Sequence, residues 1–175
     1  MNTNDGDSEL SRRLFNNPPP KNAPAGATIT YDAALLEQYK LYVEMADRIS
    51  ARRGLTNTFF LTINTGIAGL IAALHSFPTG TSAWWLAIPL VVILGQCYAW
   101  FYIVRSYRQL NGAKYRVVGA LEEQLPASPF WRAEWWVLGE GKDRALYWPL
   151  SHIEQWVPIL FALTYLVGYL AILLA

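Results

Sequence analysis

The chain has 175 residues, of which 53% are hydrophobic and only 15% are charged, and its formal net charge is +1. A typical soluble domain carries about 25% charged residues, and a protein that coats nucleic acid needs many basic side chains. This composition argues against an ordinary soluble globule, a disordered chain and a nucleic-acid-binding protein. The single cysteine, Cys97, excludes an intrachain disulfide and a multi-cysteine zinc site.

The first 28 residues are predicted to form a disordered N-terminal tail. Arg12 and Arg13 are followed by only two apolar residues before a run of asparagines and prolines, whereas a signal peptide needs 7–15 apolar residues at that point. We therefore expect no cleavable signal. Residues 29–175 are predicted to form a single membrane module.

Residues 31–53 have the pattern of an amphipathic helix. Apolar positions recur at spacings of four and three residues, at Leu35, Tyr39, Tyr42, Ala46 and Ile49. Such a stripe needs an apolar partner surface. The partner is either the chain's own cytoplasmic segment or a neighbouring subunit, and the sequence leaves both alternatives open.

Two long segments contain no charged residue, from Gly54 to Val104 and from Gln155 to Ala175. A helix that crosses a bilayer needs about 20 apolar residues, and backbone polar groups in lipid must be paired internally. The breaker-rich turn at 76–82 divides the first segment in two. The sequence predicts an all-α integral membrane protein with cytoplasmic and interfacial helices and three transmembrane helices, near 57–75, 84–104 and 155–175.

Basic residues indicate how these helices are oriented. Cytoplasmic flanks of membrane helices carry an excess of lysine and arginine. Such residues precede the first predicted span and follow the second, at Arg48, Arg52, Arg53, Arg105, Arg108, Lys114 and Arg116. We therefore expect a multi-pass protein whose N-terminus and 105–154 segment are cytoplasmic and whose C-terminus is external.

The first predicted span carries a polar and small-residue face. Asn57 and Asn64 fall within 20° of each other at 100° per residue, and Gln96 lies in the second span. Such residues either pack helices together or line a water-filled path. Three spans offer few partners, so we expect a homo-oligomer. The candidate oligomer- or pore-facing residues are Asn57, Thr58, Thr62, Asn64, Thr65, Gly69 and Gln96.

Two further clusters are expected at the membrane surface. Trp131, Trp135 and Trp136 suit a helix that lies in the interface, although a packed cytoplasmic core could use the same side chains. Ser151 and Glu154 have the spacing of a capping box at the start of the last helix, with His152 beside them.

The sequence contains no recognisable set of catalytic residues, and a His–Glu pair alone cannot hold a metal. We expect no enzyme activity, no metal and no cofactor. An active site formed by His152 and Glu154 at headgroup level is a third hypothesis. The expected partners are further copies of the chain and membrane lipids, with no nucleic acid, and other protein partners are unknown.

Several stretches together resemble a known family. They include 46–53, Asn57-Thr58-Phe59-Phe60-Leu61, 106–111, Leu121-Glu122, 138–141 and Pro149-Leu150-Ser151-His152-Ile153-Glu154. The set resembles the small bacterial inner-membrane proteins of the RipA type, described as octameric membrane proteins. The resemblance covers roughly 36–165. The segment around Asn57 is also similar, more distantly, to the membrane effector domains of the SLATT group.

The resemblance implies a homo-octamer in the bacterial cytoplasmic membrane with a role in envelope or stress physiology. The first functional hypothesis is therefore a non-enzymatic scaffold or sensor. The alternative is a pore or channel, which could be a defence effector, with Asn57, Asn64 and Thr65 facing the lumen.

Overall fold

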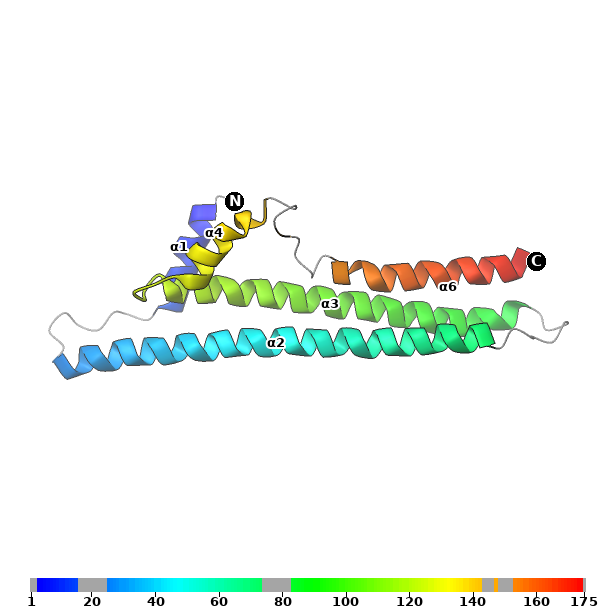
Figure 1. Cartoon of the computed structure of the whole chain (residues 1–175), viewed down its shortest axis with the longest axis horizontal. Coiled ribbons are helices and arrows are strands. Elements are labelled where there is room, and N and C mark those ends of the chain that lie inside the picture. Colours follow the sequence, from blue (N-terminus) through cyan, green and yellow to red (C-terminus); the bar gives the residue numbers. More distant parts are fainter. Residues whose placement is uncertain (1–2, 16–24, 74–82, 143–146, 148–152, 175) are drawn as a thin grey trace. The chain divides into compact units, whose positions relative to one another are not determined.

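The computed structural model describes residues 3–15, 25–73, 83–142, 147 and 153–174, and in this part of the chain it contains helices and no strands (Figure 1). The all-α prediction is therefore confirmed there. In chain order the elements are α1 (Thr3–Leu14), α2 (Ala25–Ala73), the 3-10 helix η1 (Ala83–Leu86), α3 (Ala87–Glu122), the π-helix η2 (Pro129–Glu134), α4 (Trp135–Val137), η3 (Gly139–Gly141) and α6 (Trp156–Leu174).

Helix α1 lies inside the segment that the sequence predicts to be disordered. Its Glu9 carboxylate accepts hydrogen bonds from the Arg12 Nε and Nη2 at 2.8 Å and from the Arg13 Nε at 2.6 Å. Pairs of opposite charge three and four residues apart stabilise a short helix, and two arginines in its last turn interact favourably with the helix dipole. These local contacts account for a helix where the composition suggested none.

Helix α2 is one continuous helix of 49 residues. At 1.5 Å per residue it is about 74 Å long, more than twice the thickness of the hydrocarbon core. The predicted amphipathic helix at 31–53 and the predicted span at 57–75 are therefore two halves of the same helix. Its N-terminal half carries exposed ion pairs such as Arg48–Glu44, while its C-terminal half is free of charge.

Two of the described helices, α3 and α6, are long and apolar enough to cross a membrane. Most of their residues are exposed, including Val91, Val92, Leu160 and Val167, each more than 60% accessible. Soluble proteins rarely expose apolar surface on this scale, so these helices are not the core of a soluble fold. The C-terminal half of α2 is less apolar because asparagines and threonines interrupt it, and the predicted count of three spans is not confirmed.

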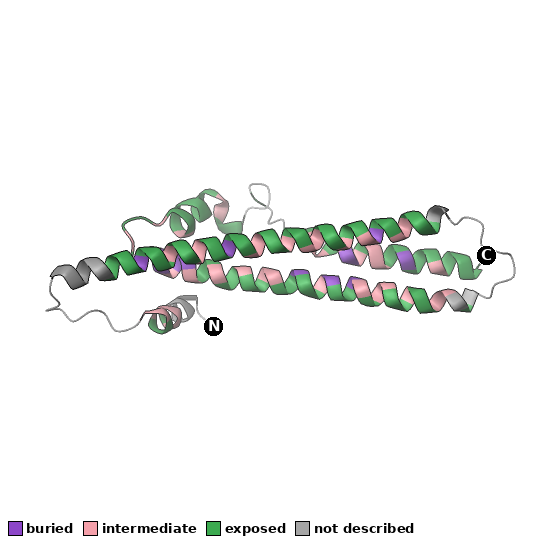
Figure 2. Ribbon diagram, turned by 90° about the horizontal axis from the view of Figure 1, so that it is seen from below, coloured by how far each residue is buried: buried purple, intermediate pink, exposed green. Residues whose placement is uncertain are grey.

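The chain divides into two compact units, and the predicted single membrane module stays a prediction. The first unit comprises Met1–Ser50 and Gln109–Trp148, and the second comprises Ala51–Arg108 and Pro149–Ala175. Helices α2 and α3 each contribute one half to each unit. The second unit brings together the C-terminal half of α2, the N-terminal half of α3 and α6, and its exposed residues greatly outnumber its buried ones (Figure 2).

Helix α3 continues unbroken past the predicted second span to Glu122. A turn follows the tryptophans of η2 and α4. Gly139, Glu140 and Gly141 have φ values of 66°, 55° and 71°. This left-handed region is open to glycine at little cost, so the two glycines allow the chain to reverse here.

Candidate functional site

An aromatic cluster centred on Trp100 of α3 holds the second unit together. Trp100 is 1% exposed, and its ring stacks on Phe60 of α2 with the centroids 5.6 Å apart and the planes 12° apart. Phe161 of α6 lies 6.1 Å from Trp100, and Tyr165 lies 6.3 Å from Phe161. Aromatic pairs at these separations each contribute about 0.5–1.5 kcal/mol beyond the area they bury. The cluster therefore links all three helices of the unit.

The two asparagines of the first predicted span point into this unit. The Trp100 Nε1 donates a hydrogen bond to the Asn57 Oδ1 at 2.9 Å. Asn64 is 0% exposed, its Nδ2 donates to the Phe60 carbonyl at 2.8 Å, and the Cys97 Sγ donates to its Oδ1 at 3.8 Å. The Tyr165 hydroxyl also donates to the Asn64 carbonyl oxygen at 2.8 Å.

The prediction that Asn57 and Asn64 face a pore or a neighbouring subunit stays a prediction, and within the chain both side chains already have hydrogen-bond partners. Helical periodicity placed both residues on one face, but the same periodicity does not say which neighbour that face meets. Within the chain, the Trp100 indole is the partner of the Asn57 side chain, and the Cys97 thiol and the Phe60 carbonyl are the partners of the Asn64 side chain. A buried amide needs such hydrogen-bond partners. The asparagines thus act as internal packing contacts between α2, α3 and α6.

A different face of α2 remains open. Thr58, Thr62, Thr65 and Gly69 are all exposed in the single chain, and at 100° per residue they fall within about 60° of one another. We call this set the threonine face. It lies opposite Phe60 and Ile67, which point toward α3 and α6. The threonine face is the part of the predicted oligomer- or pore-facing set that stays available, and it is the candidate functional site of the second unit.

One hydroxyl group of the threonine face, that of Thr58, has a hydrogen-bond acceptor within its own helix. The Thr58 Oγ1 donates to the Gly54 carbonyl at 3.1 Å, as the Thr56 Oγ1 does to the Arg52 carbonyl at 2.9 Å. Bonding to the carbonyl four residues earlier is a common way for threonine to be accommodated in a helix. A hydroxyl used in this way can contact lipid or a packed helix without an unpaired donor.

Gln96 of α3 is half-buried, and its Nε2 has no hydrogen-bond partner within the described ranges. The side-chain amide nitrogen of Gln96 therefore has no hydrogen-bond acceptor among those residues. A buried amide nitrogen without an acceptor costs about 1–3 kcal/mol. Its assignment to a subunit contact stays a prediction.

At the other end of the second unit, polar contacts tie the start of α6 to both long helices. The Arg53 Nε lies 3.2 Å from the Glu154 Oε2, with both side chains mostly buried, and the Arg108 Nη1 donates to the Gln155 Oε1 at 3.1 Å. The sequence did not predict this role for Glu154. Its predicted capping partner Ser151 and the neighbouring His152 lie outside the described residues.

The first unit is organised around a buried carboxylate that sequence reasoning missed. Glu122, the last residue of α3, is 1% exposed. In the described part of the chain it accepts four hydrogen bonds: from the Tyr39 hydroxyl of α2 at 2.9 Å, the Ser128 hydroxyl at 2.9 Å, and the backbone amides of Phe130 and Trp131 at 3.2 and 2.9 Å.

This arrangement lets Glu122 cap the N-terminus of η2 from a distance. The Ser128 side chain makes no capping bond of its own, and the carboxylate accepts from the first free amides in its place, where a negative charge is favoured. A charged group is tolerated in a buried position only when its hydrogen bonds are made. The signal available in the sequence was weak, since Glu122 stands beside the equally acidic Glu123.

The three tryptophans predicted at the membrane interface divide into two groups. Trp131 is half-buried, and its ring packs directly on the backbone of Gly119 in α3. This contact favours the packed alternative for Trp131, and its assignment to the interface stays a prediction. Trp135 and Trp136 are 40% and 73% exposed. Their placement at the membrane surface stays a prediction.

Replacing Gly119 by alanine is expected to loosen the packing between α3 and η2. A Cβ at this position would lie 2.6 Å from the Trp131 Cδ2, so the indole ring must move, and overpacking of this kind costs about 1–3 kcal/mol. Gly112→Ala is the matched control, because a Cβ there meets nothing within 4 Å and alanine is the better helix former. Thermal unfolding should show a loss for Gly119→Ala and a small gain for Gly112→Ala. Equal midpoints would contradict the contact.

The hydrogen bond between Tyr39 and Glu122 predicts a pH dependence. Burial first, and then the bond to the Glu122 carboxylate, raises the pKa of Tyr39 to about 12 from an ordinary value of about 10. A raised pKa means that the fold favours the neutral phenol. This contribution is complete below about pH 10 and is lost as the pH rises through about 12. The wild type should therefore lose more thermal stability over this interval than Tyr39→Phe, and parallel losses would disprove the linkage.

The described part of the chain is helical, and two of its helices are long and apolar enough to cross a membrane while burying few of their residues, which fits a helical membrane protein. This chain belongs to the octameric membrane protein family: the family model, described as Octameric membrane protein family (8xMP), matches residues 36–174. The match begins inside α2, ends with α6 and includes Glu122 and the threonine face. Comparisons with curated proteins and with solved structures found no match. The predicted resemblance to the octameric family is confirmed, while the likeness to the SLATT group stays a prediction.

Proposed function

We propose that the chain is a non-enzymatic subunit of a homo-octamer in the bacterial cytoplasmic membrane, where it acts as a scaffold or sensor. The observation that carries this proposal is the threonine face, an exposed stripe of threonine and glycine on the uncharged half of α2. Small residues let helices approach closely in lipid. A second copy of the chain is the partner that the family description favours.

The internal contacts favour a sealed assembly over a conducting one. The side chains of Asn57 and Asn64, which would give a pore its strongest polarity, are engaged with Trp100, Cys97 and the helix backbone. Polar groups inside membranes favour water-filled cavities only when the protein leaves them free. In this arrangement the polarity of the membrane segment serves assembly.

The octamer contact can be tested with Gly69→Leu. A Cβ on Gly69 meets nothing within 4 Å in the single chain, and leucine is a better helix former than glycine, so the subunit fold should persist. A bulky side chain on the threonine face should prevent close approach of the neighbour. Mass photometry of the detergent-purified protein is expected to show octamers for the wild type and mainly smaller species for Gly69→Leu.

Gly95→Leu is the control for this experiment, since Gly95 is an exposed glycine of α3 with the same open surroundings. It should remain octameric. Octamers formed equally well by Gly69→Leu, or lost only in Gly95→Leu, would place the contact elsewhere and overturn the proposed role of the threonine face.

A second candidate function, a channel, is favoured by one observation: the threonine face is exposed and carries hydroxyl groups. In a ring of subunits the same face could line a lumen. Planar-bilayer recordings separate the two functions. A scaffold predicts no current, whereas a channel predicts a conductance that changes in Thr62→Leu.

The proposal includes three spans, formed by the C-terminal half of α2, the N-terminal half of α3 and α6, with a cytoplasmic N-terminus as the positive flanks favour. Because Cys97 is the single cysteine, a Cys97→Ser background allows new cysteines to report sidedness. Trp84→Cys should react with an impermeant maleimide in intact spheroplasts. Gly112→Cys should react only after permeabilisation, and the reverse pattern would overturn the orientation.

A further inference from the structure

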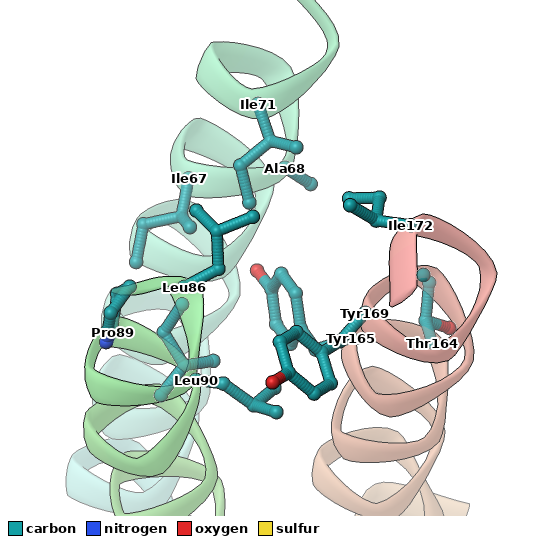
Figure 3. A pocket seen from close by; sticks show the side chains of 12 residues that line it. Ile67, Ala68, Ile71, Leu86, Pro89, Leu90, Thr164, Tyr165, Tyr169 and Ile172 are labelled. Atoms are coloured by element: carbon teal, nitrogen blue, oxygen red, sulfur yellow. The ribbon is translucent and has the colours of Figure 1, made fainter. Parts of the chain in front are cut away.

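The second unit contains an apolar pocket between the C-terminal end of α2, the start of α3 and α6 (Figure 3). Its volume is about 480 Å³, within the range of about 300–1,000 Å³ that is typical of ligand sites. Ile67 and Ala68 line it from α2, Ile93 from α3, and Tyr165, Gly168 and Ile172 from α6. The walls are therefore almost entirely aliphatic or aromatic.

Two of the three hydroxyl groups in the pocket lining, those of Tyr165 and Thr164 but not that of Tyr169, have hydrogen-bond partners in the described part of the chain. The Tyr165 hydroxyl donates to the Asn64 carbonyl at 2.8 Å, and the Thr164 Oγ1 donates to the Leu160 carbonyl at 2.9 Å. An occupant therefore meets hydrocarbon on most sides and gains little from carrying polar atoms, because it would have to desolvate them without compensation. The chemistry of the lining selects an apolar ligand.

The pocket is continuous with a surface that hydrocarbon would cover. Ile172 of α6, which lines the pocket, is itself 46% exposed, while Leu163 and Leu170 on the opposite face of α6 are 53% and 44% exposed. On a helix apolar enough to cross a membrane, such residues face lipid tails. A lipid tail can reach the pocket without crossing a polar barrier.

A second copy of the chain is the less suitable occupant. Ile67 and Ile71 line the pocket, and at 100° per residue each lies about 160° from Gly69 around the axis of α2. The threonine face, where the neighbouring subunit is proposed to pack, therefore points away from the pocket. A subunit seated there leaves the pocket open to the bilayer.

We infer that this pocket binds one acyl chain of a membrane lipid, which packs between α6 and the pair formed by α2 and α3. The acyl chain fills space that the three helices leave empty. It supplies the van der Waals contacts that the residues of the pocket wall lack when the pocket is empty. The inference rests on the proposed membrane placement of α2 and is independent of whether the octamer is a scaffold or a channel.

Photocrosslinking in vesicles tests this inference. The full chain is reconstituted into phosphatidylethanolamine and phosphatidylglycerol that contain a phosphatidylethanolamine with a diazirine in its acyl chain. After illumination, the modified residues are mapped by mass spectrometry. The wild type is expected to be labelled at Ala68 and Ile93 inside the pocket, and also at Leu163 and Leu170 on the lipid-facing surface.

Gly168→Leu should remove only the labelling inside the pocket. A Cβ on Gly168 meets nothing within 4 Å, so a leucine there can occupy the pocket without displacing a neighbour. Labelling at Ala68 and Ile93 should fall about tenfold, equivalent to about 1.4 kcal/mol. Ala68→Leu, which fills the pocket from the opposite wall, should reduce labelling at Ile93 in the same way, and Gly95→Leu should leave the pattern unchanged.

Labelling at Leu163 and Leu170 reports insertion into the bilayer. If these residues are labelled while Ala68 and Ile93 are not, or if Gly168→Leu leaves pocket labelling at the wild-type level, the acyl-chain inference is wrong although the membrane placement stands. If none of the four is labelled, the placement of these helices in the bilayer fails first, and the acyl-chain inference fails with it.

Discussion

Glu122→Ala is expected to lower the free energy of unfolding of the first unit by about 4 kcal/mol. The substitution leaves the Tyr39 and Ser128 hydroxyls and the amides of Phe130 and Trp131 without their acceptor. Hydrogen bonds to charged groups contribute about 1.5–3 kcal/mol each, though not additively, and breaking a buried ionic network costs about 3–5 kcal/mol. Hydrogen–deuterium exchange should accelerate most strongly at residues 129–134, where the capped amides lie.

Two matched variants define what the Glu122 measurement means. Glu122→Gln keeps the shape of the side chain and one acceptor oxygen, but it places an NH2 group opposite hydrogen-bond donors. We therefore expect about half of the loss in unfolding free energy that Glu122→Ala causes. Glu123→Ala removes the adjacent carboxylate, whose partner Arg132 is 3.2 Å away in an exposed pair, and should change stability by less than about 1 kcal/mol. If Glu122→Ala behaves like Glu123→Ala, the carboxylate does not organise the first unit.

Trp100→Ala is the second large effect and is expected to destabilise the second unit by about 3 kcal/mol. It removes the stack on Phe60 and the contact with Phe161, and it leaves the Asn57 Oδ1 without its donor. In a membrane the loss comes mainly from packing and the hydrogen bond, because lipid is as apolar as the helix core. Thermal unfolding in detergent should register the change as a lower midpoint.

Trp100→Phe separates the two contributions to that loss. It preserves an aromatic ring but deletes the Nε1 donor, so a loss of about 1 kcal/mol is expected. Trp84→Ala is the control, because Trp84 belongs to the same unit and is 74% exposed. A midpoint for Trp100→Ala no lower than that for Trp84→Ala would show that Trp100 is not the centre of the unit.

The sequence alone determined where the helices of the second unit lie. The uncharged segment from Gln155 to Ala175 matches α6 (Trp156–Leu174) almost residue for residue. The N-terminal half of α3 and the C-terminal half of α2 lie in the other uncharged segment, from Gly54 to Val104. The position of a membrane helix depends on local sequence, because its side chains must be apolar in lipid and its backbone groups must form hydrogen bonds within the same helix. The family resemblance also depended on the order and spacing of short stretches.

Only the tertiary structure decided which way these helices face and which polar groups meet. Periodicity grouped Asn57 and Asn64 with the threonines, but contacts with Trp100 and Cys97 turn the asparagine side chains inward and leave the threonine face outside. Glu122 meets Tyr39 across 83 positions of sequence. Such pairings depend on how helices pack in three dimensions, and helical periodicity describes only one helix at a time.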